Sequence, residues 1–311
     1  MAKQPSVILD VDPGHDDAVA ILLAAESEKI DLRGITVVAG NQVLSKTLLN
    51  TRRICSAAGI EDVAIYSGMD SPMVRDQVTG EHIHGSSGLE GPSFDAPHIE
   101  VQDKHAVDFI IDHCLQSNTG ITLAPVGPLT NVAMALRREP EIKDNIEEIV
   151  LMGGSMGLGN HTAAAEFNVF ADPEAADVVF NSGLPITMVG LDLTRQAEVT
   201  SRVLDRIRSI GNSVSELVVE ALEYFGLAYK KSMTLDNPPL HDPCVVAYLI
   251  DRSVLTVKEM RVDIDLSHGL NYGRTVCDYY HRSEKKVNAK VALDLDKERF
   301  WEILLQNLER Y

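Results

Sequence analysis

The sequence predicts an α/β fold in which an open, mostly parallel sheet is flanked by helices, and three observations predict it. Short apolar runs rich in β-branched residues alternate with longer segments of helical period, which is typical of a parallel sheet covered on both faces. The chain has 311 residues, of which 45% are hydrophobic, enough for a substantial core. Unusual polar residues come directly after the apolar runs, where the loops of such a sheet converge. We expect one domain over residues 1–311.

The first third of the chain alternates between the two patterns. Apolar runs predict strands, and a period of 3.6 residues predicts helices. The expected strands are residues 7–11, 35–38 and 63–66, and the expected helices are residues 16–26 and 44–58. Residues 67–98 show neither pattern and contain glycine, serine and histidine, so we expect a long loop there.

The remainder of the chain continues the alternation and then changes character. Further strands are expected at residues 121–124, 149–152 and 186–189, helical structure at 201–233, strand-like structure at 255–295 and an amphipathic helix at 297–308. The segment "NPPLHDP" interrupts the helical pattern. After it, Asp242 suits an N-cap and Pro243 suits the first position of a new helix.

Charge and cysteine content restrict the class of partner and the compartment. Lys and Arg total 28 and Asp and Glu total 46, a formal charge of −18, which repels nucleic acid and anionic lipid. The four cysteines are far apart and form no CxxC pair, so we expect reduced, mostly buried thiols. The N-terminal apolar run is too short for a signal peptide, and no run reaches transmembrane length. We therefore expect a cytoplasmic protein.

An unusual concentration of acids follows the first expected strand. "DVDPGHDD" contains Asp10, Asp12, Asp16 and Asp17 within eight residues. Strand alternation places Asp10 and Asp12 on one side, and the Pro-Gly turn returns the later acids toward them. A helix dipole stabilises each nearby acid by only about 0.3–1 kcal/mol. Crowded carboxylates therefore predict a hard divalent cation with oxygen ligands.

A simpler interpretation is that Asp16 and Asp17 are ordinary acids of a first helical turn and Asp12 is a cap. The preceding strand and Asp10 favour the metal site instead. Such a site needs ligands from elsewhere in the chain. The best second source is Asp242 in "HDP", and a backbone carbonyl could come from the loop at Val126.

Several motifs in fixed order resemble those of the inosine-uridine preferring nucleoside hydrolases. The motifs are "DVDPGHDDAVAI", Asn41, "VGPLTN", "VLMGG", "NHTAAAEFNVFADPEAA" and "HDP". The resemblance extends from about residue 7 to residue 246, and the C-terminal portion adds little. It implies a Rossmann-like sheet and hydrolysis of the N-glycosidic bond of ribonucleosides, uridine and cytidine or inosine, to ribose and free base.

The resemblance also implies one bound Ca²⁺. Its matching ligands are the side chains of Asp12, Asp17 and Asp242 and the carbonyl of Val126, with Asp10 supporting the loop. A water and the 2′ and 3′ hydroxyls of ribose would complete the shell. Seven or eight oxygens around the ion suit calcium better than magnesium.

Substrate contacts are implied in the same way. The expected substrate-binding residues are Asp16, Asn41, His82, Met152, Asn160, Glu166, Phe167, Asn168, Tyr229 and His241. The residues of "EFN" are expected to alternate, with Glu166 and Asn168 on one side and Phe167 pointing away. Hydrolysis passes through an oxocarbenium-like sugar attacked by water. Asp12 is the expected base for that water, and His241 is the expected proton donor to the leaving base.

The sequence indicates the residues that would recognise the base less clearly than those that would bind the metal and the ribose. His82 and His84 could face the base from a loop or face solvent, and Tyr224, Phe225 and Tyr229 could stack on the base or pack in the core. The only tryptophan is Trp301 near the C-terminal end. This argues for an inosine-uridine or pyrimidine type over purine-only relatives that use indoles. Met233 leaves the choice between pyrimidine and purine open.

Two alternatives belong to other classes. An apolar strand followed by DxD also opens haloacid-dehalogenase-like phosphatases, which use Mg²⁺, although "EFN" and "HDP" have no role in that chemistry. A calcium-dependent nucleoside binder without catalysis is the non-enzymatic alternative. Relatives are dimers or tetramers, so the resemblance implies a homo-oligomer that binds a small nucleoside.

Overall fold

The first apolar run forms a central strand of the sheet. In the computed structural model, which describes residues 4–233 and 235–311, β1 (Ser6–Val11) pairs in parallel with β2 (Asp31–Val37) and β5 (Ile121–Pro125). Val7 and Leu9 pack in one hydrophobic core, and Ile8 packs in a second one. Successive residues of β1 therefore face opposite sides of the sheet, and both sides are covered.

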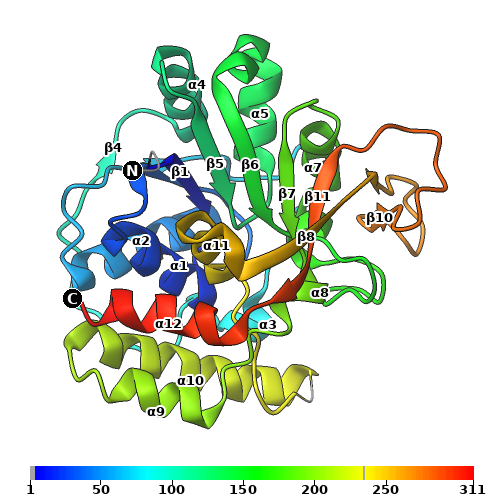
Figure 1. The fold of residues 1–311 in the computed structure, drawn as a ribbon. Coiled ribbons are helices and arrows are strands. Elements are labelled where there is room, and N and C mark those ends of the chain that lie inside the picture. Colours follow the sequence, from blue (N-terminus) through cyan, green and yellow to red (C-terminus); the bar gives the residue numbers. More distant parts are fainter. Residues whose placement is uncertain (1–3, 234) are drawn as a thin grey trace.

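Nine strands of the described chain form one sheet, in the order β4-β3-β2-β1-β5-β6-β7-β11-β8 (Figure 1). The remaining strands of this sheet are β3 (Ile65–Ser67), β4 (Val101–Gln102), β6 (Ile146–Met152), β7 (Ile186–Val189), β8 (Leu255–Met260) and β11 (Ala289–Leu295). All neighbours pair in parallel except β8, which is antiparallel to β11. The parallel pairing brings the carboxyl ends of the central strands to one edge.

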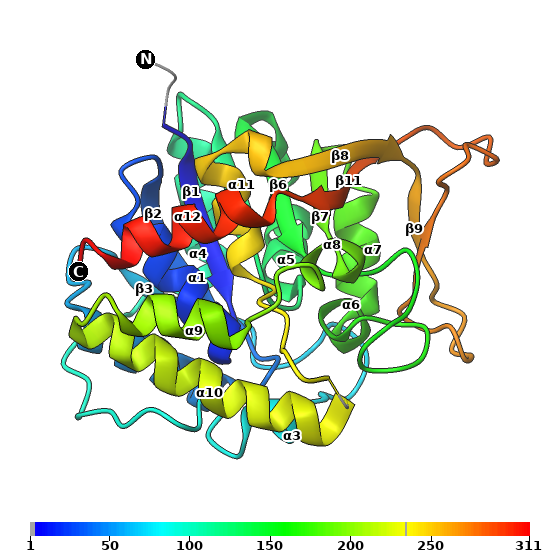
Figure 2. The same cartoon turned by 60° about the horizontal axis from the view of Figure 1, so that its bottom comes forward.

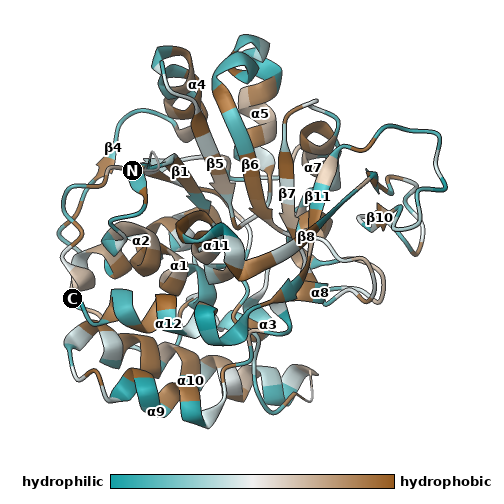
Figure 3. Cartoon of the chain, viewed as in Figure 1, coloured by the Kyte–Doolittle hydropathy of each residue, from teal (hydrophilic) through white to brown (hydrophobic). Residues whose placement is uncertain are grey.

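Helices cover both faces of this sheet. One core is formed largely by α1 (His15–Glu26), α2 (Leu44–Ala58), α9 (Ser201–Arg208), α10 (Ser213–Met233), α11 (Pro243–Ile250) and α12 (Lys297–Leu308). The other is formed by α4 (Ala106–Gln116), α5 (Thr130–Arg138) and α7 (Pro173–Phe180). Figure 2 shows α9 and α10 side by side, and Figure 3 shows the central strands β5, β6 and β7 as predominantly hydrophobic. The predicted fold class is confirmed: this is a single α/β domain with a large, mostly parallel sheet flanked by helices.

Short elements complete the chain at the site edge and at the periphery. These are α3 (Glu81–His84), α6 (Phe167–Ala171), α8 (Leu191–Thr194), the 3₁₀ helices η1 (Pro140–Asn145) and η2 (Arg252–Val254), and the β9–β10 ribbon (Val262–Ile264 and Thr275–Cys277). The β9–β10 ribbon pairs antiparallel and projects from one end of the molecule (Figure 2). None of the described helices is both long enough and apolar enough to span a bilayer.

Most predicted elements are present, but several differ from the expectation. Residues 67–98, expected to be a loop, contain α3, and the third strand is Ile65–Ser67 rather than residues 63–66. The second strand begins at Asp31, four residues before the expected start. The expected helical segment 201–233 is two helices, interrupted where Gly211 adopts φ +76°, a conformation that side-chain-bearing residues avoid. Asp242 stands at the N-cap of α11 as expected, but its side chain makes no capping hydrogen bond. All four cysteines are free thiols, and Cys277 alone is not fully buried.

Candidate active site

The Pro-Gly turn after β1 folds its acids inward. Asp17 lies in the first turn of α1, and its two carboxylate oxygens accept the backbone N–H groups of Asp12 and Gly14, each at 3.0 Å. This bonding stabilises the start of α1 in the manner of a capping box. It also fixes one acid at the carboxyl edge of the sheet, where a ligand can reach it.

Asp12 has one satisfied oxygen and one unsatisfied oxygen. Its Oδ2 accepts the backbone N–H of Asn41 at 2.6 Å, whereas its buried Oδ1 has no hydrogen-bond partner. Two glycines surround this carboxylate closely: a Cβ atom on Gly40 would lie 2.1 Å from Oδ2, and one on Gly127 would lie 2.4 Å from Oδ1. The site therefore holds a buried carboxylate oxygen that still needs a partner.

Four carboxylates meet at this edge. Asp16, Asp17 and Asp242 can each place one oxygen within 4.8 Å of the others, and Asp12 lies beside them. Burial is the main reason why these acids resist ionisation, and their mutual repulsion adds to it. Burial and the charge of Asp17 raise the pKa of Asp16 to about 8 and raise that of Asp12 well above its ordinary value. A divalent cation would remove this penalty, so the donor set fits a metal ion.

Asp10 and Val126 lie behind this cluster. Asp10 Oδ1 accepts hydrogen bonds from Thr36 at 2.5 Å and Asn131 at 2.7 Å, and burial raises the pKa of Asp10 to about 7. Its backbone carbonyl accepts the N–H of Val126 at 2.8 Å. The carbonyl of Val126 accepts the side-chain amide of Asn168 at 2.6 Å, which leaves its second lone pair available.

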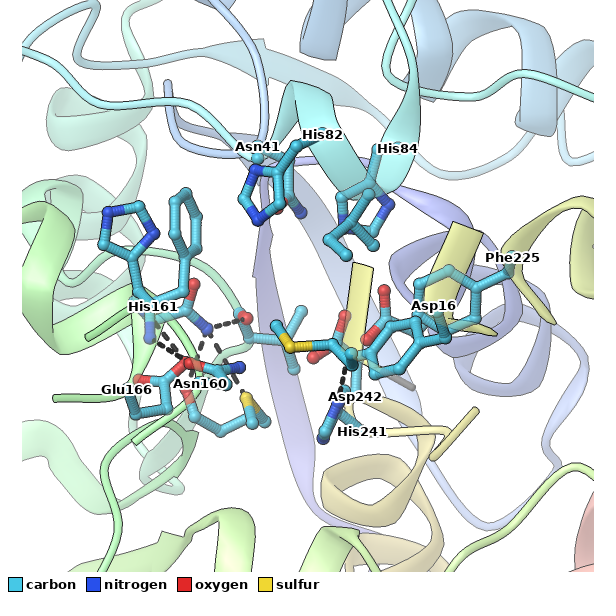
Figure 4. A pocket seen from close by; sticks show the side chains of 18 residues that line it. Asp16, Asn41, His82, His84, Asn160, His161, Glu166, Phe225, His241 and Asp242 are labelled. Atoms are coloured by element: carbon cyan, nitrogen blue, oxygen red, sulfur yellow. Dashed lines mark hydrogen bonds between the residues drawn. The ribbon is translucent and has the colours of Figure 1, made fainter. Parts of the chain in front are cut away.

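A cavity of about 530 Å³ opens beside the acids (Figure 4). The lining residues are Asp16, Asn41, Gly80, His82, Ile83, His84, Val126, Met152, Asn160, His161, Glu166, Phe167, Asn168, Phe225, Tyr229, Met233, His241 and Asp242. All ten residues predicted to contact substrate are among them. Asp12 and Asp17 are fully buried behind the wall.

The "EFN" segment is a helix start rather than the continuation of a strand. Glu166 caps α6, and its two oxygens accept the backbone N–H groups of Asn168, Val169 and Gly154 at 2.9–3.1 Å. The expectation that Phe167 points away from its neighbours is therefore wrong, because the chain turns and Phe167 also lines the cavity. Capping holds all three residues of the motif at the rim.

His241 joins two hydroxyl groups. Its Nδ1 lies 2.7 Å from Thr194 Oγ1, and its Nε2 lies 2.9 Å from the hydroxyl of Tyr229. Burial and the positive charge of Arg195 lower the pKa of His241 to about 3, while burial raises the pKa of Tyr229 above its ordinary value. The imidazole is neutral and the phenol is protonated, so the pair can offer a neutral hydrogen-bond donor to a ligand.

Comparison with known proteins gives the family. The family model for inosine-uridine preferring nucleoside hydrolases matches residues 7–302. The chain belongs to this family. It is 45% identical over 309 residues to the pyrimidine-specific ribonucleoside hydrolase RihB of Escherichia coli O1:K1, covering 99% of this chain and 98% of the relative.

Solved structures agree with this assignment. The purine-preferring ribonucleoside hydrolase from Gardnerella vaginalis superposes with a TM-score of 0.91 at 32% identity, covering 98% of both chains. The plant nucleoside hydrolase PpNRh1 superposes with a TM-score of 0.91 at 27% identity, covering 99% of this chain and 100% of that one. This nucleoside hydrolase therefore cleaves ribonucleoside N-glycosidic bonds. Membership of the family sets aside the phosphatase alternative.

The two histidines of α3 have different surroundings in this nucleoside hydrolase. His82 is exposed at the cavity rim, and its ring centroid lies 6.3 Å from that of His161. His84 is buried, and its Nδ1 lies 3.0 Å from Nδ1 of His15. Its ring also stacks on Phe225, with 5.5 Å between the ring centroids. The helix α3 is therefore anchored to α1 through one histidine and presents the other to the cavity.

Some residues of the nucleoside hydrolase site were absent from the predicted set, and some candidates lie elsewhere. Thr194 and His161 were not predicted, although His161 belongs to a motif that carries the family resemblance. Tyr224 stacks on His15 with 5.4 Å between ring centroids and does not line the cavity, so it packs rather than faces a base. Trp301 is buried against Phe300 in α12.

Proposed function

We propose that this chain hydrolyses pyrimidine ribonucleosides, uridine and cytidine, to ribose and free base, and that it uses one bound Ca²⁺. The observation that carries the proposal is the convergence of all ten expected substrate residues on one cavity beside a crowded acid cluster. The pyrimidine preference is supported by relatives at 45% identity that are named pyrimidine-specific. The relative at 32% identity that is named purine-preferring argues less strongly for this chain.

Asp12, Asp17 and Asp242, with the carbonyl of Val126, would hold the ion. The unpartnered Oδ1 of Asp12 and the close approach of Asp17 to Asp242 support this set. Asp16 belongs to the same tight triad and also lines the cavity, so it would bind the ribose hydroxyls beside the ion. A bound Ca²⁺ would supply positive charge that acidifies a water and holds two ribose hydroxyls.

The surrounding polar residues would fix the ribose. Asp16 and Asn168 face the cavity from the acid side, and Asn160 faces it from the rim loop. Carboxylates and amides can accept or donate to each ribose hydroxyl. Asn41 completes the set, since its backbone and side chain already hold Asp12 and Asp17 in place. Glu166 contributes by holding the rim loop and α6 in position.

The chemistry follows from charge placement. The carboxylate of Asp12 would also accept the proton of the water that attacks C1′. The acidic surroundings would stabilise the positive charge that develops on the sugar. The Tyr229–His241 pair would offer one hydrogen bond to the departing base and so relieve its negative charge. Phe225 and Met233 would provide apolar contact to the base, since both line the cavity.

We also propose that the protein is a homo-oligomer and that it is cytoplasmic. The loops around the β9–β10 ribbon support oligomerisation because they display exposed apolar side chains: Leu270, between β9 and β10, is 97% exposed, and Tyr280, after β10, is 76% exposed. Contact with a second copy of the chain at this end would remove these side chains from water. Free thiols support a reducing compartment.

A steady-state panel of uridine, cytidine, inosine, adenosine and their 2′-deoxy forms tests the proposal. Ribose release should be fastest with uridine and cytidine, and deoxyribonucleosides should be poor substrates because a hydroxyl contact is lost. EDTA should abolish turnover and Ca²⁺ should restore it. Faster turnover of inosine than of uridine would overturn the base preference. Tight uridine binding without ribose release would favour the non-catalytic binder instead.

A further inference from the structure

The hydroxyl of Thr194 is buried with a single partner. Thr194 is the last residue of α8, the short helix that follows β7, and it is 0% exposed. Within the described residues, the one hydrogen bond assigned to its Oγ1 is the 2.7 Å contact with His241 Nδ1. A buried hydroxyl carries one proton that needs an acceptor, and leaving that proton unpaired is unfavourable.

The need of the Thr194 proton for an acceptor fixes the direction of the hydrogen bonds around His241. Thr194 donates to His241 Nδ1, so that nitrogen carries a lone pair and the ring proton resides on Nε2. The Nε2–H then donates to the Tyr229 oxygen 2.9 Å away. The phenolic proton of Tyr229 is thereby left free, and Tyr229 lines the cavity. In the opposite arrangement Tyr229 would donate to His241 and the Thr194 proton would have no acceptor.

We propose that Thr194 is a positioning residue that sets the tautomer of His241, so that the Tyr229 hydroxyl donates to the departing base. The inference rests on the proposed function, because it assigns a task to the same site. Thr194 touches neither base nor ribose in this scheme and acts only through His241. One ring nitrogen of a histidine is commonly fixed by the partner of the other.

The short helix α8 holds Thr194 rigidly in this position. The backbone N–H of Thr194 bonds to the carbonyl of Gly190 at 3.0 Å, and that of Leu191 bonds to the carbonyl of Gly154 at 2.9 Å. Next in the chain, Arg195 donates to the carbonyl of Gly159 at 2.8 Å. The segment that carries Thr194 is therefore tied to the rim loop that precedes Asn160, and its backbone would be retained when the hydroxyl alone is removed.

The experiment compares Thr194→Val, which removes the hydroxyl at nearly constant shape, with Thr194→Ser, which keeps it. Each variant is assayed on uridine and on p-nitrophenyl riboside, whose leaving group needs no hydrogen-bond donor. Thr194→Val should lower kcat on uridine by about 10- to 100-fold and leave p-nitrophenyl riboside within about threefold of wild type. Thr194→Ser should stay close to wild type on both substrates. In a Tyr229→Phe background, Thr194→Val should add little further loss on uridine, because both changes interrupt one chain.

Thr130→Val is the matched control. It removes another buried hydroxyl, which donates to Asp172 at a distance of 2.7 Å, and neither residue lines the cavity. Its effect on kcat should therefore be the same for the two substrates. Equal losses of Thr194→Val on both substrates, or no loss on uridine, would overturn the inference while leaving the proposed function intact. Absence of uridine turnover in the wild-type protein would instead overturn the proposed function and the inference with it.

Discussion

The backbone N–H of Asn41 lies 2.6 Å from Asp12 Oδ2 and joins the turn after β2 to the end of β1. The side-chain amide of Asn41 also donates to the Asp12 carbonyl at 3.2 Å and to Asp17 Oδ2 at 3.3 Å. One residue therefore fixes the orientation of two acids. This bonding occupies one oxygen of Asp12 and leaves the other for chemistry.

Asp12→Asn should lower kcat by about two orders of magnitude or more, because an amide cannot accept the proton of the attacking water. The amide oxygen can still accept the N–H of Asn41, so folding stability should change only modestly. Initial rates on uridine and a thermal unfolding curve measure the two effects. The exposed Asp62→Asn is the control, and near-normal turnover of Asp12→Asn would remove Asp12 from the role of base.

Gly127→Ala should disable the site by displacing the same carboxylate. The added Cβ would lie 2.4 Å from Asp12 Oδ1 and 2.9 Å from its Cγ, closer than real Cβ contacts allow. We expect a large loss of kcat together with weaker stabilisation by Ca²⁺. Gly226→Ala is the matched control, because its Cβ would meet nothing nearer than 3.7 Å and it lies within α10. Similar behaviour of the two variants would contradict this reasoning.

Calcium should stabilise the folded chain, since the ion offsets repulsion that only the folded state assembles. A 100-fold excess over Kd stabilises by about 2.7 kcal/mol, which corresponds to a rise in Tm of about 5 °C for a chain of this size. Mg²⁺ should produce a smaller rise. Asp242→Asn should remove most of the Ca²⁺ response, whereas Asp62→Asn should keep it. A Tm that does not respond to Ca²⁺ in the wild-type protein would argue against the metal site.

His241→Ala should discriminate between leaving groups. The change removes the partner of the Tyr229 hydroxyl, so uridine turnover should fall by about 10²- to 10⁴-fold. Turnover of p-nitrophenyl riboside should fall by less than about tenfold, because its leaving group departs without help. Parallel kcat measurements on the two substrates show whether His241 assists the departure of the base. Comparable losses on both would give His241 a purely structural role.

Much of the sheet edge was predictable because its acids follow a strongly apolar strand. Buried parallel strands end where ligands bind, and the motif order added the distant "HDP" segment. Predicted and observed bounds coincide for β7, which is a short buried run, and for α2 and α12, which have a clear helical period. The break between α9 and α10 depends on one glycine at φ +76°, a local signal that a helical period of that length conceals.

The unpredicted contacts join residues that are distant in sequence. His15 and His84 are 69 positions apart, and Thr194 and His241 are 47 apart, so neither pair leaves a local pattern. A threonine that ends a four-residue helix has no signature of its own. Its place in the segment that follows β7 was the one available signal, because polar residues at that edge of the sheet gather around ligands.

Glu166→Gln should destabilise the rim more than it affects chemistry. Three backbone N–H groups, those of Gly154, Asn168 and Val169, point at the two oxygens of this buried carboxylate. Glutamine offers one carbonyl oxygen and replaces the other acceptor by an NH₂ group, so at least one buried N–H loses its partner. We expect a loss of about 1–3 kcal/mol in the free energy of unfolding and a higher KM for uridine.

Urea unfolding at fixed Ca²⁺ and steady-state kinetics measure these two effects of Glu166→Gln. The control is Glu141→Gln, because Glu141 is exposed in η1 and should leave both quantities within error. The acid at position 166 also faces the cavity, so a direct ribose contact would produce a different result. In that case KM would rise strongly while the free energy of unfolding stayed at the wild-type value, because the hydrogen bonds that hold α6 would be intact.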